Sequence, residues 1–258
     1  MQRIPNPKAL LLAAAVAFAT VRALAASIVV STPEDWNGVL NPREADGVTL
    51  SGSGAPGDPA VYTIPDGLVT QSTGAIRLTA DLNDDADNAN IMFLFAAGDL
   101  QIEEGGYIET SLGNRGDNRS FILDLGGGSI TGAGRIVGLR DGGDRNKKPR
   151  GLTIQNVMNV ELNEIDLHVE NVSLEIQEDL KVTATGQVRI KGMVNYSDTD
   201  SGGNPVRAVR IDAESIEVGG IDTRAWRAGP PGRASGDVVL RALSAVGNYD
   251  PAFPVNQF

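Results

Sequence analysis

The chain has 258 residues, a formal net charge of −11 and no cysteine. The absence of cysteine excludes a disulfide scaffold, so stability must come from buried apolar area and from hydrogen bonds. The acidic excess disfavours binding to nucleic acid, anionic lipid and uronate polymers unless cations intervene. The alternative interpretation is that acidity only keeps an exported protein soluble, for example in salty surroundings.

The first 25 residues have the layout of a secretory signal peptide and are not expected to join the fold. A basic start precedes an unbroken run of apolar and small residues over 9–20, and Ala23-Leu-Ala25 has the form of a cleavage site. A retained membrane anchor is the alternative, but the apolar core is too short to span a bilayer. Removing residues 1–25 leaves 19 basic and 33 acidic residues, a formal net charge of −14. We therefore expect an exported protein, secreted or at the cell surface, with no membrane span in the mature chain.

Residues 26–74 are predicted to form an irregular N-terminal cap that contains the first strands. Proline occurs five times between positions 33 and 65, and residues 51–57 have the composition of a loop. The apolar pieces 48–50 and 61–64 are short strand candidates. A solenoid exposes apolar surface and unpaired strand edges at its end, so it needs a covering element of this kind.

Residues 75–258 are predicted to form the coils of a parallel β-helix. Strand signals recur there every eight to twelve residues, β-branched residues are abundant, and no long stretch has helical periodicity. One phrase, an apolar–polar–apolar triplet followed by a small turn and another alternating stretch, occurs at 100–110, 160–167, 180–190 and 216–223. Each copy predicts a strand, a corner and a second strand. Repeats of this kind indicate stacked coils that bury their apolar sides against one another.

A pair of matching segments predicts the length of one coil. Leu152-Thr-Ile-Gln155 matches Leu174-Glu-Ile-Gln177 at an offset of 22 residues. Such a coil places Ile154 and Ile176 in one interior, in adjacent coils. A β-sandwich also has evenly spaced short strands, but the repeat keeps residue identity and two-residue hairpin signals are missing. The predicted fold class is therefore all-β, a right-handed single-stranded parallel β-helix (solenoid) with an irregular N-terminal cap.

Two β-helical families resemble parts of these coils. Residues 121–176 resemble the pectin-lyase-like group, especially polygalacturonase-type glycosidases, which show a similar progression of glycine-rich turn, Arg-Pro, strand, Asn-Val and strand. The motifs are Ile130-Thr-Gly-Ala-Gly-Arg-Ile136, Lys148-Pro-Arg150 and the segment 152–167. Residues 174–247 are similar to the coils of filamentous-haemagglutinin-type secreted adhesins, on the motifs Ile216-Glu-Val-Gly-Gly-Ile-Asp-Thr223 and Ser235-Gly-Asp-Val-Val-Leu-Arg-Ala242. The resemblance implies a parallel β-helix. These motifs mostly encode the geometry of the coil, so they indicate little about enzymatic activity.

The residues that would make the chain an enzyme can be sought directly. Polygalacturonase-type enzymes need paired aspartates, a Gly-His-Gly segment and a later Arg-Ile-Lys, and glycoside hydrolysis needs two carboxylates across the scissile bond. Arg189-Ile-Lys191 is present, but the only histidine, His168, has no flanking glycine. No Asn-Thr-Asp or Gly-Asp-Asp lies between Ile154 and Arg189. We interpret Arg189 and Lys191 as exposed residues of an alternating strand and His168 as a packed or strand-surface residue, so no catalytic or cofactor-binding residue is assigned.

The leading candidate metal site is an acidic loop. Alternate oxygen side chains on a tight loop suit Ca²⁺, which takes six to eight oxygen ligands, and the segment resembles the start of an EF-hand-type loop. Ala86 replaces the turning glycine and Met92 stands where the bidentate glutamate belongs. Any Ca²⁺ binding should therefore be weak, and a solvated acidic turn is the alternative. The candidate ligands are Asp81, Asn83, Asp85 and Asp87.

Three other features are weaker candidates for ligand sites. Residues 198–204 form a second, weaker candidate for Ca²⁺. The glycines between 126 and 134 are explained as coil corners, because no strand–turn–helix unit follows as a dinucleotide site requires. Trp36 and Trp226 could stack on sugar rings, but no row of aromatic residues is visible.

The leading hypothesis is a non-catalytic exported surface or matrix protein, an adhesin-like β-helix whose partner is a glycan or another surface protein. The alternative is a degenerate or unrecognised polysaccharide lyase or glycoside hydrolase of the pectin-lyase-like fold. A third hypothesis is that the coils are incomplete at the C-terminus and belong to a longer protein, because residues 248–258 show no capping pattern. We expect no nucleic-acid partner and no cofactor other than weakly bound Ca²⁺.

Overall fold

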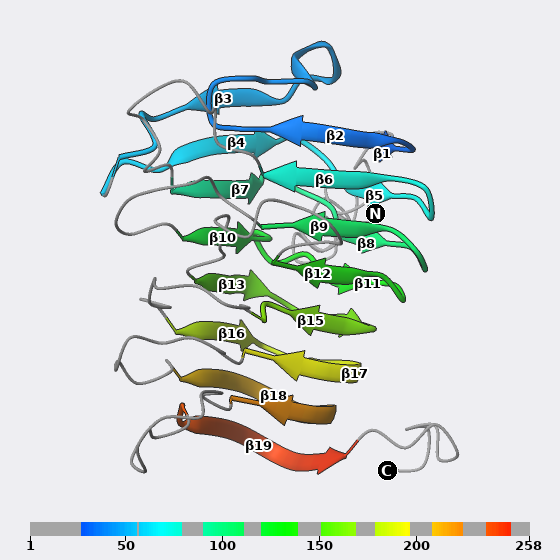
Figure 1. Cartoon of the computed structure of the whole chain (residues 1–258), viewed down its shortest axis with the longest axis vertical. Coiled ribbons are helices and arrows are strands. Elements are labelled where there is room, and N and C mark those ends of the chain that lie inside the picture. The colour runs from blue at the N-terminus through cyan, green and yellow to red at the C-terminus, as the bar shows by residue number, and fades with distance from the viewer. Residues whose placement is uncertain are drawn as a thin grey trace, which may run out of the picture.

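The computed structural model describes residues 27–55, 57–78, 90–110, 120–138, 151–168, 179–196, 208–223 and 236–248. Within these ranges, regular structure consists of nineteen β-strands and one short 3-10 helix, η1 (Glu44–Asp46). The strands lie one below another along the long axis of the molecule. They run from β1 (Ile28–Val30) near one end to β19 (Val238–Asn248) at the other (Figure 1).

The strands pair in three parallel ladders. The first ladder contains β4 (Ala60–Ile64), β7 (Ile91–Phe95), β10 (Phe121–Asp124), β13 (Leu152–Val157), β16 (Leu180–Ala184), and the first parts of β18 (Val209–Asp222) and β19. The second contains β1, β5 (Leu68–Thr70), β8 (Leu100–Ile102), β11 (Ile130–Thr131), β14 (Val160–Leu162), the first part of β17 (Gln187–Asn195), and later parts of β18 and β19. The third contains β2 (Pro33–Trp36), β6 (Ala75–Leu78), β9 (Tyr107–Glu109), β12 (Arg135–Val137), β15 (Glu164–Asp166), and the ends of β17 and β18.

This arrangement confirms the predicted all-β parallel solenoid. From β4 to β18 each coil contributes one segment to each ladder, and the same segment of the next coil stacks beside it in parallel. Among the described strands, the single antiparallel partner is β3 (Thr49–Ser51), which pairs with β4 at the N-terminal end. The predicted phrases at 100–110, 160–167 and 216–223 cross from the second ladder to the third, whereas 180–190 crosses from the first to the second. Each copy therefore does form a strand, a corner and a strand, but the copies are not equivalent in the coil.

The predicted coil length of 22 residues is wrong. Leu152 pairs with Leu180, 28 positions later, and Phe121 pairs with Leu152, 31 positions later. Ile154 accordingly stacks on Val182, while Ile176 lies outside the described residues. The physical reason is that one alternating apolar strand resembles any other in sequence, so a sequence match does not identify the strand that stacks beside it. The number of residues between stacked strands depends on the corner segments, which carry no repeated pattern.

The interior is built from columns of side chains that continue from coil to coil. Because successive side chains of a strand point to opposite faces, every second residue of each ladder enters the core. In the third ladder one such column consists of Ile76, Ile108, Ile136, Ile165 and Val194, all fully buried. At about 25 cal/mol per Å² of apolar area removed from water, this burial is the main source of stability.

Four aromatic rings close the interior at the N-terminal end. Trp36 lies 4.9 Å from the ring centroids of both Tyr62 and Phe93, and Phe93 lies 5.1 Å from that of Phe121 in an edge-on arrangement. All four side chains are fully buried. The Tyr62 hydroxyl donates to the Leu40 carbonyl at 2.7 Å and accepts from the backbone N–H that follows Asn37 at 2.8 Å. The buried polar tip of the cluster is thus satisfied by the loop that covers it.

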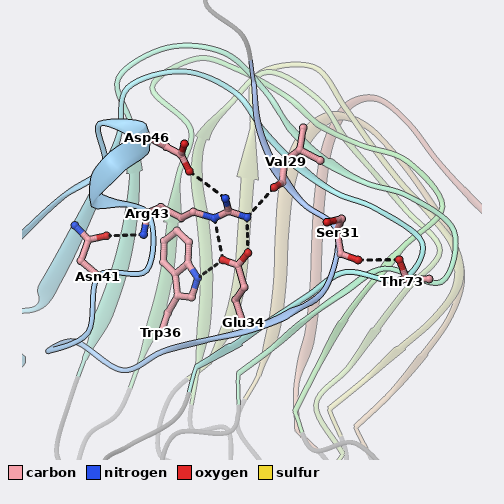
Figure 2. Close-up of polar contacts among 8 residues, drawn as sticks. All are labelled: Val29, Ser31, Glu34, Trp36, Asn41, Arg43, Asp46 and Thr73. Atoms are coloured by element: carbon pink, nitrogen blue, oxygen red, sulfur yellow. Dashed lines mark hydrogen bonds and ion pairs between the residues drawn. The ribbon is translucent and has the colours of Figure 1, made fainter.

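An ion pair between Glu34 and Arg43 lies beside Trp36 of this cluster (Figure 2). Glu34 occupies the column that Ile76 continues in the next coil, and its carboxylate pairs with Arg43 and accepts from Trp36 Nε1 at 3.3 Å. Arg43 also pairs with Asp46 at 3.0 Å and donates to the Val29 carbonyl at 2.7 Å. Glu34 therefore ends an interior column, and the Arg43 guanidinium both neutralises its carboxylate and occupies a backbone acceptor of the first strand.

Thr70 is an exception inside the second ladder and gives a stability prediction. Its side chain is fully buried between Val30 and Ile102 in one column, and among the described residues its hydroxyl has no hydrogen-bond partner. A buried polar group without a partner costs roughly 1–3 kcal/mol. We expect Thr70→Val to raise the free energy of unfolding by about 1 kcal/mol, measured by urea denaturation.

The matched control for this prediction is Thr73→Val. The Thr73 hydroxyl is exposed and donates to the Ser31 carbonyl at 2.8 Å, so its loss should give no gain in stability. A loss of stability in Thr70→Val would contradict the prediction, since it would mean that the buried hydroxyl makes a favourable interaction.

Candidate functional site

A row of charged side chains runs across three coils on the outer face of the second ladder. Glu161, Arg189 and Glu217 are in register on successive coils. Arg189 lies 3.1 Å from Glu217 and 4.0 Å from Glu161, and Lys191 lies 3.0 Å from Glu161. Ile190, between the two basic residues, is fully buried. The prediction that Arg189 and Lys191 point outward from an alternating strand is confirmed, but both side chains are half-buried and not exposed, and both have carboxylate partners.

The first ladder carries a second set of ion pairs. Arg210 lies 2.9 Å from Asp179, and Arg241 lies 3.7 Å from Asp212, each pair joining neighbouring coils. Asp179 also accepts the backbone N–H of Ala208 at 3.0 Å. Burial alone would raise the pKa of the Asp179 carboxyl. The hydrogen bonds from Arg210 and Ala208, with the nearby positive charges, outweigh it and hold that pKa below its ordinary value.

This lowered pKa predicts a pH dependence. A carboxyl whose pKa is depressed by folding stabilises the protein above its unfolded pKa, and the contribution is lost as the pH falls through the folded pKa. Asp179→Asn should therefore lose less stability than the wild type between pH 7 and pH 3, by about 1 kcal/mol or less for a partly exposed pair. Thermal melting as a function of pH measures this. Arg210→Gln removes the partner and should flatten the profile in the same direction, and an unchanged profile in both variants would contradict the assignment.

A buried carboxylate fastens one corner of the first ladder. Asp124 accepts hydrogen bonds from Gln155 Nε2 at 2.9 Å, from Asn156 Nδ2 at 2.7 Å and from the N–H of Gly126 at 3.1 Å. Asn156 has φ of 50°, the only positive φ of a non-glycine residue in the described part of the chain. Asn tolerates this left-handed conformation better than most residues. These hydrogen bonds join two successive coils, and the three donors occupy both oxygens of the Asp124 carboxylate.

Asn and Asp side chains directly before strands form a further set of links that sequence reasoning missed. Each accepts the backbone N–H of a residue at or just before the start of a strand in the next coil, at 2.7–3.0 Å. The pairs are Asn90 with Ser120, Asp99 with Ser129, Asn159 with Gln187, and Asp179 with Ala208. The available signal was an Asn or Asp immediately before three of the four repeated triplets, at 100, 160 and 180.

His168 lies apart from the charged row of Arg189. It follows β15 in the third ladder, is half-buried, and its backbone N–H donates to Asp166 Oδ1 at 3.2 Å. Arg189 projects from the second ladder. These two residues, which a polygalacturonase-type mechanism would combine, thus belong to different faces of the coil.

The structure places only some of the other candidates. Asp81, Asn83, Asp85 and Asp87 lie outside the described residues, as do 198–204 and Trp226, so the Ca²⁺ loop stays a prediction. In the described ranges, no three His, Asp or Glu side chains could together hold a metal ion. Trp36 is fully buried, so the suggestion that it stacks on a sugar is wrong. Gly126, Gly127 and Gly132 have positive φ at coil corners, which confirms their structural explanation.

The geometry defines a parallel β-solenoid with paired charges on its outer faces. The described residues include no helix long and apolar enough to cross a membrane. Comparisons with protein-family models, with curated proteins and with solved structures each find no match to this chain.

Proposed function

We propose that the chain is a non-catalytic exported surface or matrix protein, whose β-solenoid is a rigid body that contacts a glycan or another surface protein. The single observation that carries this proposal is that outward charged side chains form ion pairs between neighbouring coils. All three ladders carry ion pairs between neighbouring coils, including Arg77 with Asp35 at 2.8 Å and Arg135 with Glu164 at 3.8 Å. Exposed pairs contribute about 0–1 kcal/mol each, more when they form a network. They support the stack of coils, which is what an extended structural body requires.

In the region that resembles the secreted adhesins, the strands continue from one ladder into the next. From β1 to β16 the described strands have two to six residues, whereas β17, β18 and β19 have 9, 14 and 11 residues. These three long strands lie in the region 174–247 that resembles the secreted adhesins. The resemblance of residues 121–176 to the pectin-lyase-like group concerns the fold alone, and we propose no enzymatic activity from it.

An activity assay tests the non-catalytic part of the proposal. The purified chain is incubated with a panel of acidic and neutral glycans in the presence of Ca²⁺, and reducing ends and unsaturated products are measured. We expect no product from any glycan. Product formation that disappears in Arg189→Ala or His168→Ala would replace the proposal by the polysaccharide lyase or hydrolase alternative.

The export part is tested separately in the source cells. We expect the exported protein to begin after Ala25 or Ala26, as determined by mass spectrometry of the intact chain. We also expect a protease added to whole cells to degrade it if it stays at the surface. An intact Met1 on the exported protein, or a chain found only inside the cells, would contradict export with cleavage.

A further inference from the structure

The two ends of the solenoid differ in how their strand edges are protected (Figure 1). At the N-terminal end Arg43 donates to the carbonyl of Val29 on the first strand, and Trp36 is fully buried under the cap. Charged side chains and covering loops are the usual means of keeping sheet edges from pairing with other chains. At this end the largest apolar side chain is covered, and one backbone acceptor of the first strand is occupied.

The last described coil, at the opposite end, exposes apolar side chains. In the described part of the chain β19 pairs on one edge only, with β18. Val238 and Val246 continue interior columns of Val209 and Ile216, yet they are 46% and 54% exposed, and Leu243 at the middle of the strand is 91% exposed. An unpaired edge that also exposes the end of the apolar core favours the addition of another strand.

The charge of the strand permits a second copy of this acidic chain at this edge. The whole chain has a net charge of −11, so two copies repel each other over most of their surfaces. The segment 238–248 contains no acidic residue and one basic residue, Arg241. Arg241 is already paired with Asp212 of the neighbouring coil, so the strand itself is close to neutral and places no carboxylate of its own opposite another copy.

We propose that two copies of this chain associate through antiparallel pairing of their β19 strands. The first part of β19 belongs to the first ladder and the second part to the second ladder, with Leu243 between them. A twofold axis through Leu243 places the first part of one strand beside the second part of the other. Leu240 of one copy then meets Val246 of the second copy, and the interior columns continue across the interface.

The pairing closes on itself and has the size of a specific contact. Because both copies use the same β19 edge, the contact is twofold and is complete with two copies. An antiparallel pair of eleven-residue strands forms about ten hydrogen bonds, similar to the number in a typical protein–protein interface. Added salt screens the repulsion between the acidic bodies and should strengthen the dimer.

Sedimentation of the purified chain over a range of concentrations tests this proposal. We expect a monomer–dimer equilibrium that shifts toward the dimer at higher salt. Leu243→Lys places two positive charges at the axis and should raise the dimer dissociation constant at least about tenfold. Val39→Lys, at a residue 80% exposed in the N-terminal cap, is the matched control and should leave the dissociation constant unchanged. Circular dichroism checks that both variants fold.

Cross-linking locates the contact independently. Since the chain has no cysteine, Leu243→Cys and Val39→Cys each introduce a single thiol. A short bis-maleimide should join two Leu243→Cys chains and should not join two Val39→Cys chains. A monomer at every concentration would overturn the proposal, as would equal weakening by both lysine variants or equal cross-linking of both cysteine variants.

Discussion

Replacing Ile154 with Asp is expected to destabilise the fold by several kcal/mol, enough to unfold much of the protein at room temperature. The side chain of Ile154 is fully buried, with Leu123 and Val182 in register on the two neighbouring coils. A carboxylate there would lose its hydration and find only apolar neighbours in its column, and burial of an unpaired charge is among the costliest single changes. Urea denaturation followed by far-ultraviolet circular dichroism measures the loss.

The control lies one residue away on the same strand. Thr153 points to the outer face and is half-buried, and Lys181 is its register partner in the next coil. Thr153→Asp should change the free energy of unfolding by about 0.5 kcal/mol or less, as surface substitutions usually do. Similar losses in the two variants would mean that the inward and outward faces of β13 have been assigned wrongly.

The architecture could be predicted because the signal is local and repeated. The alternation of apolar and polar residues in 180–190 and 216–223 is sufficient to assign strands, and repetition along the chain indicates stacking. The register could not be predicted in the same way. Leu152 has a good sequence match in Leu174, but its partner in space is Leu180, because corner segments determine the spacing and carry no apolar pattern.

The polar contacts were less predictable than the strands. Arg189 and Lys191 were recognisable as outward residues, since they alternate with a buried Ile190. Their partner Glu161 precedes Arg189 by 28 positions, which becomes visible only when the coil length is known. Glu34 and Arg43 are a different case, because Glu34 stands at a column position that is apolar in the next coil. A charge at an inward position is explained only by the cap that covers it.

Replacing Phe93 with Ala is expected to destabilise the fold by about 3–5 kcal/mol, the usual cost of removing a large core aromatic ring. Phe93 is fully buried and its ring contacts those of Trp36, Tyr62 and Phe121. Its removal leaves a cavity between the N-terminal cap and the coils, which rigid neighbouring coils can fill only in part. Chemical denaturation measures the loss, and tryptophan fluorescence in a Trp226→Phe background reports on the surroundings of Trp36.

The control for Phe93 is its neighbour Met92, which points outward from β7 and is half-buried. Met92→Ala should cost about 1 kcal/mol or less, because it leaves no enclosed cavity. If the aromatic cluster joins the cap to the coils, Phe93→Ala should also make the segment around Trp36 exchange its amide hydrogens faster, while β16 stays protected. Uniformly faster exchange along the whole solenoid would contradict this, since it would show that the cap and the coils unfold together as one cooperative unit.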